Sequence, residues 1–210
     1  MDEHFCPQCT KIVSVSRHGD YFSFLGLPRK LQIDLGDLEQ RFRGLSRQFH
    51  PDYFYNAPAV ERRASLERSS YLNDAYRTLR QPIARAEYLL QLEGVSPKGP
   101  EEAAKQVPPA LLEEVFALNE ELDEVRALRE HDAVNDEWRR RLERAAQPIE
   151  TKRADHEQQL SSLSAQWDAA VDRDAPAAER RAVLEALRGR ILERNYINNL
   201  LSGIERELNS

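Results

Sequence analysis

Apolar residues recur three and four positions apart along most of the chain, which is the spacing of amphipathic helices. Strict alternation of apolar and polar residues, the pattern of a half-buried strand, is scarce outside residues 10–16. The helical spacing is clearest in residues 38–49, 72–79, 111–125, 184–191 and 197–204. The pattern therefore predicts an all-α protein, with one short strand possible over residues 10–16.

Prolines and glycines divide this helical pattern into two parts. Residues 94–100 read Gly-Val-Ser-Pro-Lys-Gly-Pro, a composition that resists both helix and strand, and Pro108-Pro109 follows shortly after. We therefore expect a linker over residues 96–109. It would separate a first domain at residues 20–95 from a second, helical domain at residues 110–208.

Two further prolines mark features of individual helices. Pro82 suits the first turn of a helix, which we expect to run to about residue 92. Pro148 lies inside an otherwise helical stretch over residues 132–170. Because proline has no backbone N–H and clashes with the preceding turn, we expect the long helix to break or kink there.

The composition narrows the classes of function. Hydrophobic residues make up 40% of the chain and charged residues 31%, and no apolar run approaches the length of a membrane span, which excludes an integral membrane protein. A net charge of −6 argues against nucleic acid as a partner. The first residues lack the basic-then-apolar layout of a secretory signal and are too acidic for a mitochondrial presequence, so we expect a cytoplasmic protein.

The tripeptide His50-Pro51-Asp52 carries the strongest functional signal. Pro51 cannot continue the preceding helix and restricts the backbone of His50, so we expect an exposed, stiffened loop at the end of that helix. Three arginines lie off the apolar stripe of the helix, namely Arg41, Arg43 and Arg47. Their guanidinium groups suit acidic groups on a partner protein. No nucleophile or third catalytic partner accompanies His50 and Asp52, which argues against an acid–base dyad.

Residues 20–92 resemble the J-domain of DnaJ-type co-chaperones. Four stretches carry the resemblance: Asp20-Tyr21-Phe22, Leu25-Gly26-Leu27, His50-Pro51-Asp52 and Asn73-Asp74-Ala75-Tyr76-Arg77-Thr78-Leu79. It implies a helical hairpin with short helices that docks on a DnaK-type ATPase and stimulates ATP hydrolysis there. By the same resemblance the chain is not an enzyme and binds no nucleotide, and the tripeptide and the three arginines contact the chaperone.

Nearly the whole chain also resembles the HscB family, the J-proteins of iron–sulfur cluster assembly. Two stretches carry this resemblance: Arg85-Ala86-Glu87-Tyr88-Leu89-Leu90 and Asn119-Glu120-Glu121-Leu122-Asp123-Glu124. It implies a C-terminal three-helix bundle that binds the scaffold protein IscU and delivers it to HscA, a specialised DnaK-type ATPase. A J-protein with a different client and a helical adaptor that stimulates no ATPase are the alternatives.

A second apolar pair on the helix predicted at residues 111–125 is the candidate scaffold contact. Leu112 and Phe116 lie about 100° around this helix from its core stripe, with Glu120 one turn further. An apolar ridge flanked by acids suits a partner with an apolar patch and a basic rim. The HscB resemblance places these three residues at scaffold-binding positions and adds Tyr196 on the last helix. The alternatives are that Leu112 and Phe116 pack against a neighbouring helix and that Tyr196 is buried in the bundle.

The pair Cys6-Pro7-Gln8-Cys9, within an N-terminal segment of residues 1–19, has metal-binding spacing. Two thiolates make half of a tetrahedral zinc site, and His4 and His18 are candidates for the other ligands. A second chain could complete the site instead, giving a dimer, or a first CxxC pair could precede the present start, as in HscB relatives that carry two pairs. A metal-handling protein, with the CxxC pair as its working part, is a further alternative function.

Overall fold

The structure is a computed structural model that describes residues 4, 12, 19–97, 107–131 and 137–209. Within this part of the chain it contains seven α-helices and no strand, which confirms the predicted all-α class. The possible strand at residues 10–16 lies outside the described residues except for Ile12, which is buried. In the same part of the chain, no helix combines the length and the hydropathy needed to cross a membrane.

The chain divides into two compact units. Unit 1 comprises residues 1–94 together with residues 167–176, and unit 2 comprises residues 95–166 and 177–210. The inclusion of residues 167–176 in unit 1 was not predicted from the sequence. The predicted limits of the linker and the two domains stay predictions.

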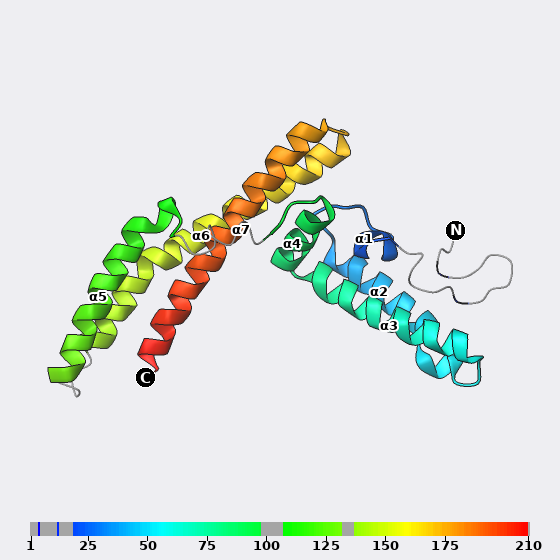
Figure 1. Ribbon diagram of the computed structural model, residues 1–210, viewed down its shortest axis with the longest axis horizontal. Coiled ribbons are helices and arrows are strands. Elements are labelled where there is room, and N and C mark those ends of the chain that lie inside the picture. Colours follow the sequence, from blue (N-terminus) through cyan, green and yellow to red (C-terminus); the bar gives the residue numbers. More distant parts are fainter. Residues whose placement is uncertain (1–3, 5–11, 13–18, 98–106, 132–136, 210) are drawn as a thin grey trace. The chain divides into compact units, whose positions relative to one another are not determined.

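Unit 1 contains helices α1 to α4 (Figure 1). Their bounds are α1 Tyr21–Phe24, α2 Leu35–Phe49, α3 Ala59–Arg80 and α4 Pro82–Leu92, with a 3-10 turn η2 at Pro51–Phe54. Helix α2 starts at the side chain of Asp34, which accepts the N–H groups of Gly36 and Asp37. Helix α4 has the bounds that Pro82 predicted.

The core of unit 1 lies between α2, α3 and the helices around them. The apolar stripe of α2 places Leu38 and Phe49 in the interior, where both side chains are completely buried. Phe42 of the same stripe stacks on Tyr76 of α3, with ring centroids 4.2 Å apart. Each fully buried side chain of this size stabilises the fold by about 1.5–3 kcal/mol. The apolar stripe of α2, which the helical spacing predicted, is thus the face that packs against α3 and the rest of the core.

Residues 167–176 complete unit 1 through polar contacts to the segment before α2. The carboxylate of Asp168 accepts hydrogen bonds from the backbone N–H groups of Leu31 (2.7 Å) and Gln32 (2.8 Å). The indole N–H of Trp167 donates to the carbonyl of Arg29 (2.9 Å). Burial raises the pKa of Asp168, and the two backbone donors oppose that shift. These contacts satisfy backbone groups of a segment that is neither helix nor strand.

Unit 2 is built on three long helices (Figure 1). They are α5 Leu112–His131, α6 Glu137–Asp172 and α7 Ala177–Leu208, preceded by the 3-10 turn η4 Pro109–Leu111. All three contribute to one apolar core, whose buried members are Leu111, Val115, Leu118, Val125, Leu142, Ile149, Ile197, Leu201 and Ile204. The last residues of α6, 167–172, and the connection at residues 173–176 belong to unit 1, whereas α7 lies in unit 2.

Helix α6 runs through Pro148 without interruption, so of the predicted break or kink the break does not occur and the kink stays a prediction. Pro148 removes one backbone hydrogen bond from the helix. Leu142 and Ile149, on either side of it, are both buried in the core of unit 2. Their burial favours the continuous helix and offsets the lost hydrogen bond.

Candidate functional site

The predicted tripeptide forms an exposed turn at the end of α2. The side chain of His50 is 51% exposed and that of Asp52 is 88% exposed. The backbone N–H of Asp52 donates to Nδ1 of His50 (3.3 Å), and the N–H of Tyr53 donates to the carbonyl of His50 (3.0 Å). Pro51 begins the 3-10 turn η2. The local backbone therefore presents both polar side chains to solvent in one closed turn.

Phe49 connects this turn to the interior of unit 1. Its side chain is buried, and its carbonyl accepts hydrogen bonds from the hydroxyls of Ser65 (2.7 Å) and Ser69 (2.9 Å) on α3. Arg68, between these serines, places its guanidinium carbon 5.2 Å from the Phe49 ring centroid. The residue before His50 is thus held through both its backbone and its side chain. Polar residues on the inward face of α3 were the sequence signal for this arrangement.

His4, a predicted zinc ligand, lies against this same group of residues. Its Nδ1 is 2.7 Å from Nη1 of Arg68, and its ring packs edge-on against Phe24 and Phe49 with centroids 4.9 and 5.1 Å away. Cys6, Cys9 and His18 lie outside the described residues.

The described surroundings of His4 are a poor fit for zinc. A metal-bound histidine usually donates its second ring nitrogen to a carboxylate, carbonyl or water, whereas the second nitrogen of His4 faces a guanidinium cation. Among the described residues, no three His, Cys, Asp or Glu side chains gather to hold a metal. The zinc site of the two cysteines stays a prediction.

The three arginines of α2 differ in their contacts. Arg41 pairs with Asp37 (2.8 Å) and donates to the carbonyls of Leu25 (3.2 Å) and Gly26 (2.8 Å), so it ties the turn after α1 to α2. Gly26 has a φ of +65°, and a Cβ there would lie 2.9 Å from the Arg41 guanidinium.

Arg43 and Arg47 remain on the outside of the helix. Arg43 pairs with Glu39 one turn earlier (2.6 Å), and Arg47 donates to the carbonyl of Arg43 (3.3 Å). Both side chains are exposed, and ion pairs of this kind on a helix surface contribute only about 0.3–0.5 kcal/mol. Both arginines can therefore turn to a partner at small cost.

Exposed apolar side chains follow the tripeptide along the chain and were not predicted from the sequence. Tyr53, Tyr55 and Val60 are among the most exposed large hydrophobic residues of the described chain. The ring of Tyr53 lies 6.1 Å from the ring of His50. The aromatic run directly after the tripeptide, which fits no helical stripe, was the available signal. The turn therefore combines polar and apolar groups on one surface.

Helix α5 in unit 2 presents the predicted apolar pair to solvent. Leu112 is 40% exposed and Phe116 is 67% exposed, whereas Leu111 and Val115 are buried. Glu120, one turn further, is also exposed. Tyr196 on α7 is half-buried and packs against the core of unit 2. Leu112, Phe116 and Glu120 thus share an exposed flank of α5, while Tyr196 contributes to packing.

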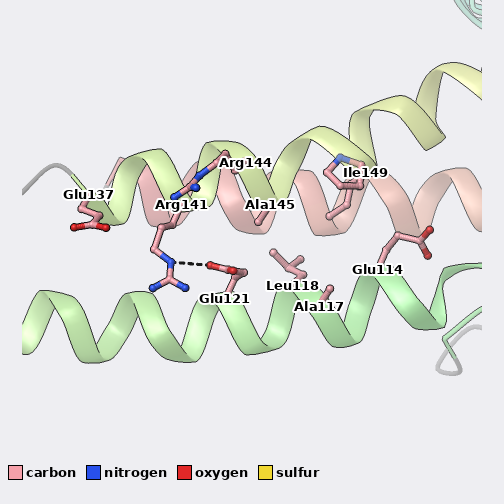
Figure 2. A pocket seen from close by; sticks show the side chains of 10 residues that line it. Glu114, Ala117, Leu118, Glu121, Glu137, Arg141, Arg144, Ala145 and Ile149 are labelled. Carbon is pink, nitrogen blue, oxygen red and sulfur yellow. Dashed lines mark hydrogen bonds and ion pairs between the residues drawn. The ribbon is translucent and has the colours of Figure 1, made fainter.

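The opposite flank of α5 borders a groove of about 420 Å³ between α5 and α6 (Figure 2). Arg141 of α6 reaches across it to Glu121 (3.0 Å) and to Glu124. Lys152 pairs with Glu114 at the other end, and this hydrogen bond lowers the pKa of the Glu114 carboxyl. One flank of α5 is therefore joined to α6 by ion pairs, and the other carries the exposed apolar pair.

Comparison with known proteins identifies the fold. No family model matches the chain. The crystal structure of the human co-chaperone protein HscB matches with a TM-score of 0.66 and 25% sequence identity, over 99% of this chain and 91% of that chain. The chain has the fold of an HscB co-chaperone. The chaperone HscB from Vibrio cholerae also matches, with a TM-score of 0.59 and 27% identity, over 91% of this chain and 98% of that chain.

The predicted resemblance to HscB is thereby confirmed for the fold. In this HscB-like chain the His50 turn belongs to unit 1, and Leu112 and Phe116 belong to unit 2. The two predicted binding surfaces therefore lie on separate compact units, and a substitution on one surface can be tested without altering the core of the other.

Proposed function

We propose that this protein is a cytoplasmic co-chaperone of iron–sulfur cluster assembly, which stimulates ATP hydrolysis by an HscA-like DnaK-type chaperone and delivers the scaffold protein IscU to it. The observation that carries the proposal is the exposed His50-Pro51-Asp52 turn, held by the buried Phe49, on a chain with the HscB fold. The chain itself performs no bond chemistry and binds no nucleotide.

Unit 1 contacts the chaperone in this proposal. Arg43 and Arg47 attract acidic groups of the partner, which raises the association rate and orients the encounter more than it adds affinity. His50 and Asp52 then meet the partner from a turn whose backbone is already closed. Because little of this turn has to be ordered on binding, the entropy cost of the contact is small.

Unit 2 binds the scaffold in this proposal. Leu112 and Phe116 offer an apolar ridge, and Glu113 and Glu120 beside it are exposed acids. A partner with an apolar patch and a basic rim complements this surface. Full burial of a side chain such as Phe116 stabilises a complex by about 1.5–3 kcal/mol, so this residue is expected to dominate the contact.

The deciding experiment measures steady-state ATP hydrolysis by an HscA-type chaperone with and without IscU. Wild type should stimulate hydrolysis synergistically with IscU. His50→Gln should abolish stimulation while it still binds IscU, and Phe116→Ser should lose the synergy while the basal stimulation by unit 1 persists. Leu66→Ser, at another exposed apolar position on α3, is the matched control and should behave as wild type.

The remaining outcomes separate the alternatives. Stimulation that is indifferent to IscU would retain the J-domain activity but assign it to a different client. No stimulation under any condition would leave a helical adaptor. Loss of cellular function in Cys6→Ala and Cys9→Ala, with ATPase stimulation and IscU binding intact, would favour the metal-handling alternative.

A further inference from the structure

Arg68 is a cation inside unit 1. Its side chain is 0% exposed, and its guanidinium carbon lies 5.9 Å from the ring centroid of Phe24 and 5.2 Å from that of Phe49. Aromatic faces attract a cation but accept no conventional hydrogen bond from it. A buried guanidinium therefore needs acceptors close by, because an uncompensated buried charge is costly.

His4, 64 positions before Arg68 in the sequence, supplies such an acceptor. Its Nδ1 lies 2.7 Å from Nη1 of Arg68. Arginine can only donate, so Nδ1 of His4 must be the accepting nitrogen and the ring proton must sit on Nε2. The His4 ring also packs edge-on against Phe24 and Phe49. One hydrogen bond and two ring contacts thus bind His4 to the interior of unit 1.

Phe49 links this contact to the functional turn. Its ring touches both His4 and Arg68, its carbonyl accepts from Ser65 and Ser69, and His50 is the next residue. Removal of the His4 ring would therefore open space beside the residue from which the turn starts. Removal of the ring would also take a hydrogen-bond acceptor from Arg68. Arg68 lies on α3 between Ser65 and Ser69, which donate to the Phe49 carbonyl.

We propose that His4 is a positioning residue, which packs into the interior of unit 1 and holds Phe49 and the His50-Pro51-Asp52 turn in place, and that it is not a zinc ligand. A zinc ion on Nε2 would put a second positive charge next to a ring already facing the Arg68 guanidinium. Only the effect on ATPase stimulation rests on the function proposed above.

The test uses the full-length chain with three substitutions. His4→Ala removes the ring and the acceptor, and His4→Asn keeps an acceptor near the position of Nδ1. Leu66→Ser is the control, because it changes an exposed side chain on α3 two positions before Arg68.

The first measurement is hydrogen exchange of the Tyr53 amide, which closes the turn on His50. His4→Ala should speed this exchange roughly tenfold, the effect of losing one hydrogen bond, with a smaller change in His4→Asn and none in Leu66→Ser. The Arg85 amide, which donates to Gln81 at 2.9 Å, should be unchanged in all three. Unchanged exchange at Tyr53 in His4→Ala would overturn the positioning role, as would equal acceleration at both amides, which would indicate general destabilisation.

The second measurement is the zinc-to-protein ratio. His4→Ala should match wild type, whether that ratio is high or zero, and Cys6→Ser provides the comparison. A ratio that falls in His4→Ala as it does in Cys6→Ser would overturn the exclusion of His4 from the zinc site.

The third measurement is the maximal ATPase stimulation of an HscA-type chaperone. It should fall in His4→Ala, recover in part in His4→Asn and stay at the wild-type level in Leu66→Ser. A chaperone that wild type fails to stimulate would contradict the proposed function, while the exchange and zinc results would still decide the role of His4.

Discussion

Asp168 and Leu31, which are 137 positions apart in sequence, are joined by a hydrogen bond of 2.7 Å from the Leu31 backbone N–H to the Asp168 carboxylate. The other carboxylate oxygen accepts from Gln32, so one side chain satisfies two consecutive backbone donors. These bonds tie residues 167–176 to the segment that leads into α2. Helix α2 carries the three arginines and ends at the His50-Pro51-Asp52 turn. Contacts that hold the segment before α2 in place therefore also help to position the proposed chaperone-binding surface.

Asp168→Ala should destabilise unit 1 by about 2–3 kcal/mol, because it leaves one buried and one partly buried backbone donor without their charged acceptor. Urea unfolding followed by Trp167 fluorescence in a Trp138→Phe background would measure this. The matched control is Asp172→Ala, which breaks only the Lys30–Asp172 pair with its exposed carboxylate and should cost less than about 1 kcal/mol. Equal effects of the two substitutions would contradict the role assigned to Asp168.

The stability of unit 2 should depend on the protonation of His156. Burial lowers the pKa of His156, the adjacent Glu193 carboxylate (3.4 Å) opposes that shift, and Arg190 and Lys152 add to it. The folded state therefore binds the proton less tightly than the unfolded state, whose histidine has a pKa near 6.5. Stability is full above that pKa and is lost as the pH falls below it, by at most about 1.4 kcal/mol per pH unit.

This pH dependence can be measured between pH 7 and pH 5 from urea unfolding, with Trp138 fluorescence in a Trp167→Phe background. His156→Leu should flatten the decline, because the titrating group is gone. Leu66→Ser, at an exposed position of unit 1 and without a titrating group, should leave the slope as it is in wild type. An unchanged slope in His156→Leu would assign the dependence to other groups.

Neighbouring positions on α5 should separate binding from stability. Phe116→Ser should weaken binding to IscU roughly 10- to 100-fold, the equivalent of one buried aromatic side chain, with little change in unfolding free energy. Leu118→Ala, two residues on but in the core, should cost about 2–5 kcal/mol of stability. Calorimetric titration and urea unfolding of the two variants would test this, and full IscU affinity in Phe116→Ser would exclude the exposed flank as the binding surface.

Arg41 and Arg43 should give opposite results although both lie on the basic helix. Arg41→Ala removes hydrogen bonds to Leu25 and Gly26 and should cost about 1–2 kcal/mol of stability. Arg43→Ala should leave stability within about 0.5 kcal/mol and slow association with the chaperone, with a weaker dependence on salt than wild type. Stopped-flow association rates at several salt concentrations, together with urea unfolding, distinguish the two roles.

Periodicity and proline placement were enough to predict the helices, because local spacing decides which face of a helix can be buried. The bounds of α4 followed from Pro82, and the exposed position of the His50 turn followed from the inability of Pro51 to continue α2. Of the break or kink expected at Pro148, the break was wrong, because the local rule ignores the apolar packing of Leu142 and Ile149 that holds α6 together. The kink stays a prediction.

The sequence by itself therefore determined the all-α class, the helix pattern and the resemblance that identifies the fold, since these depend on residue spacing and on short motifs. Only the tertiary structure decided which polar residues act together. Asp168 with Leu31, and His4 with Arg68, pair across 137 and 64 positions, and no local pattern encodes such a contact. No local pattern encodes the different contacts of two arginines on α2 either: Arg41 donates a hydrogen bond to the carbonyl of Gly26, whereas Arg43 stays exposed. Physically, a side chain's role follows from what surrounds it after folding, and those neighbours come from distant parts of the chain.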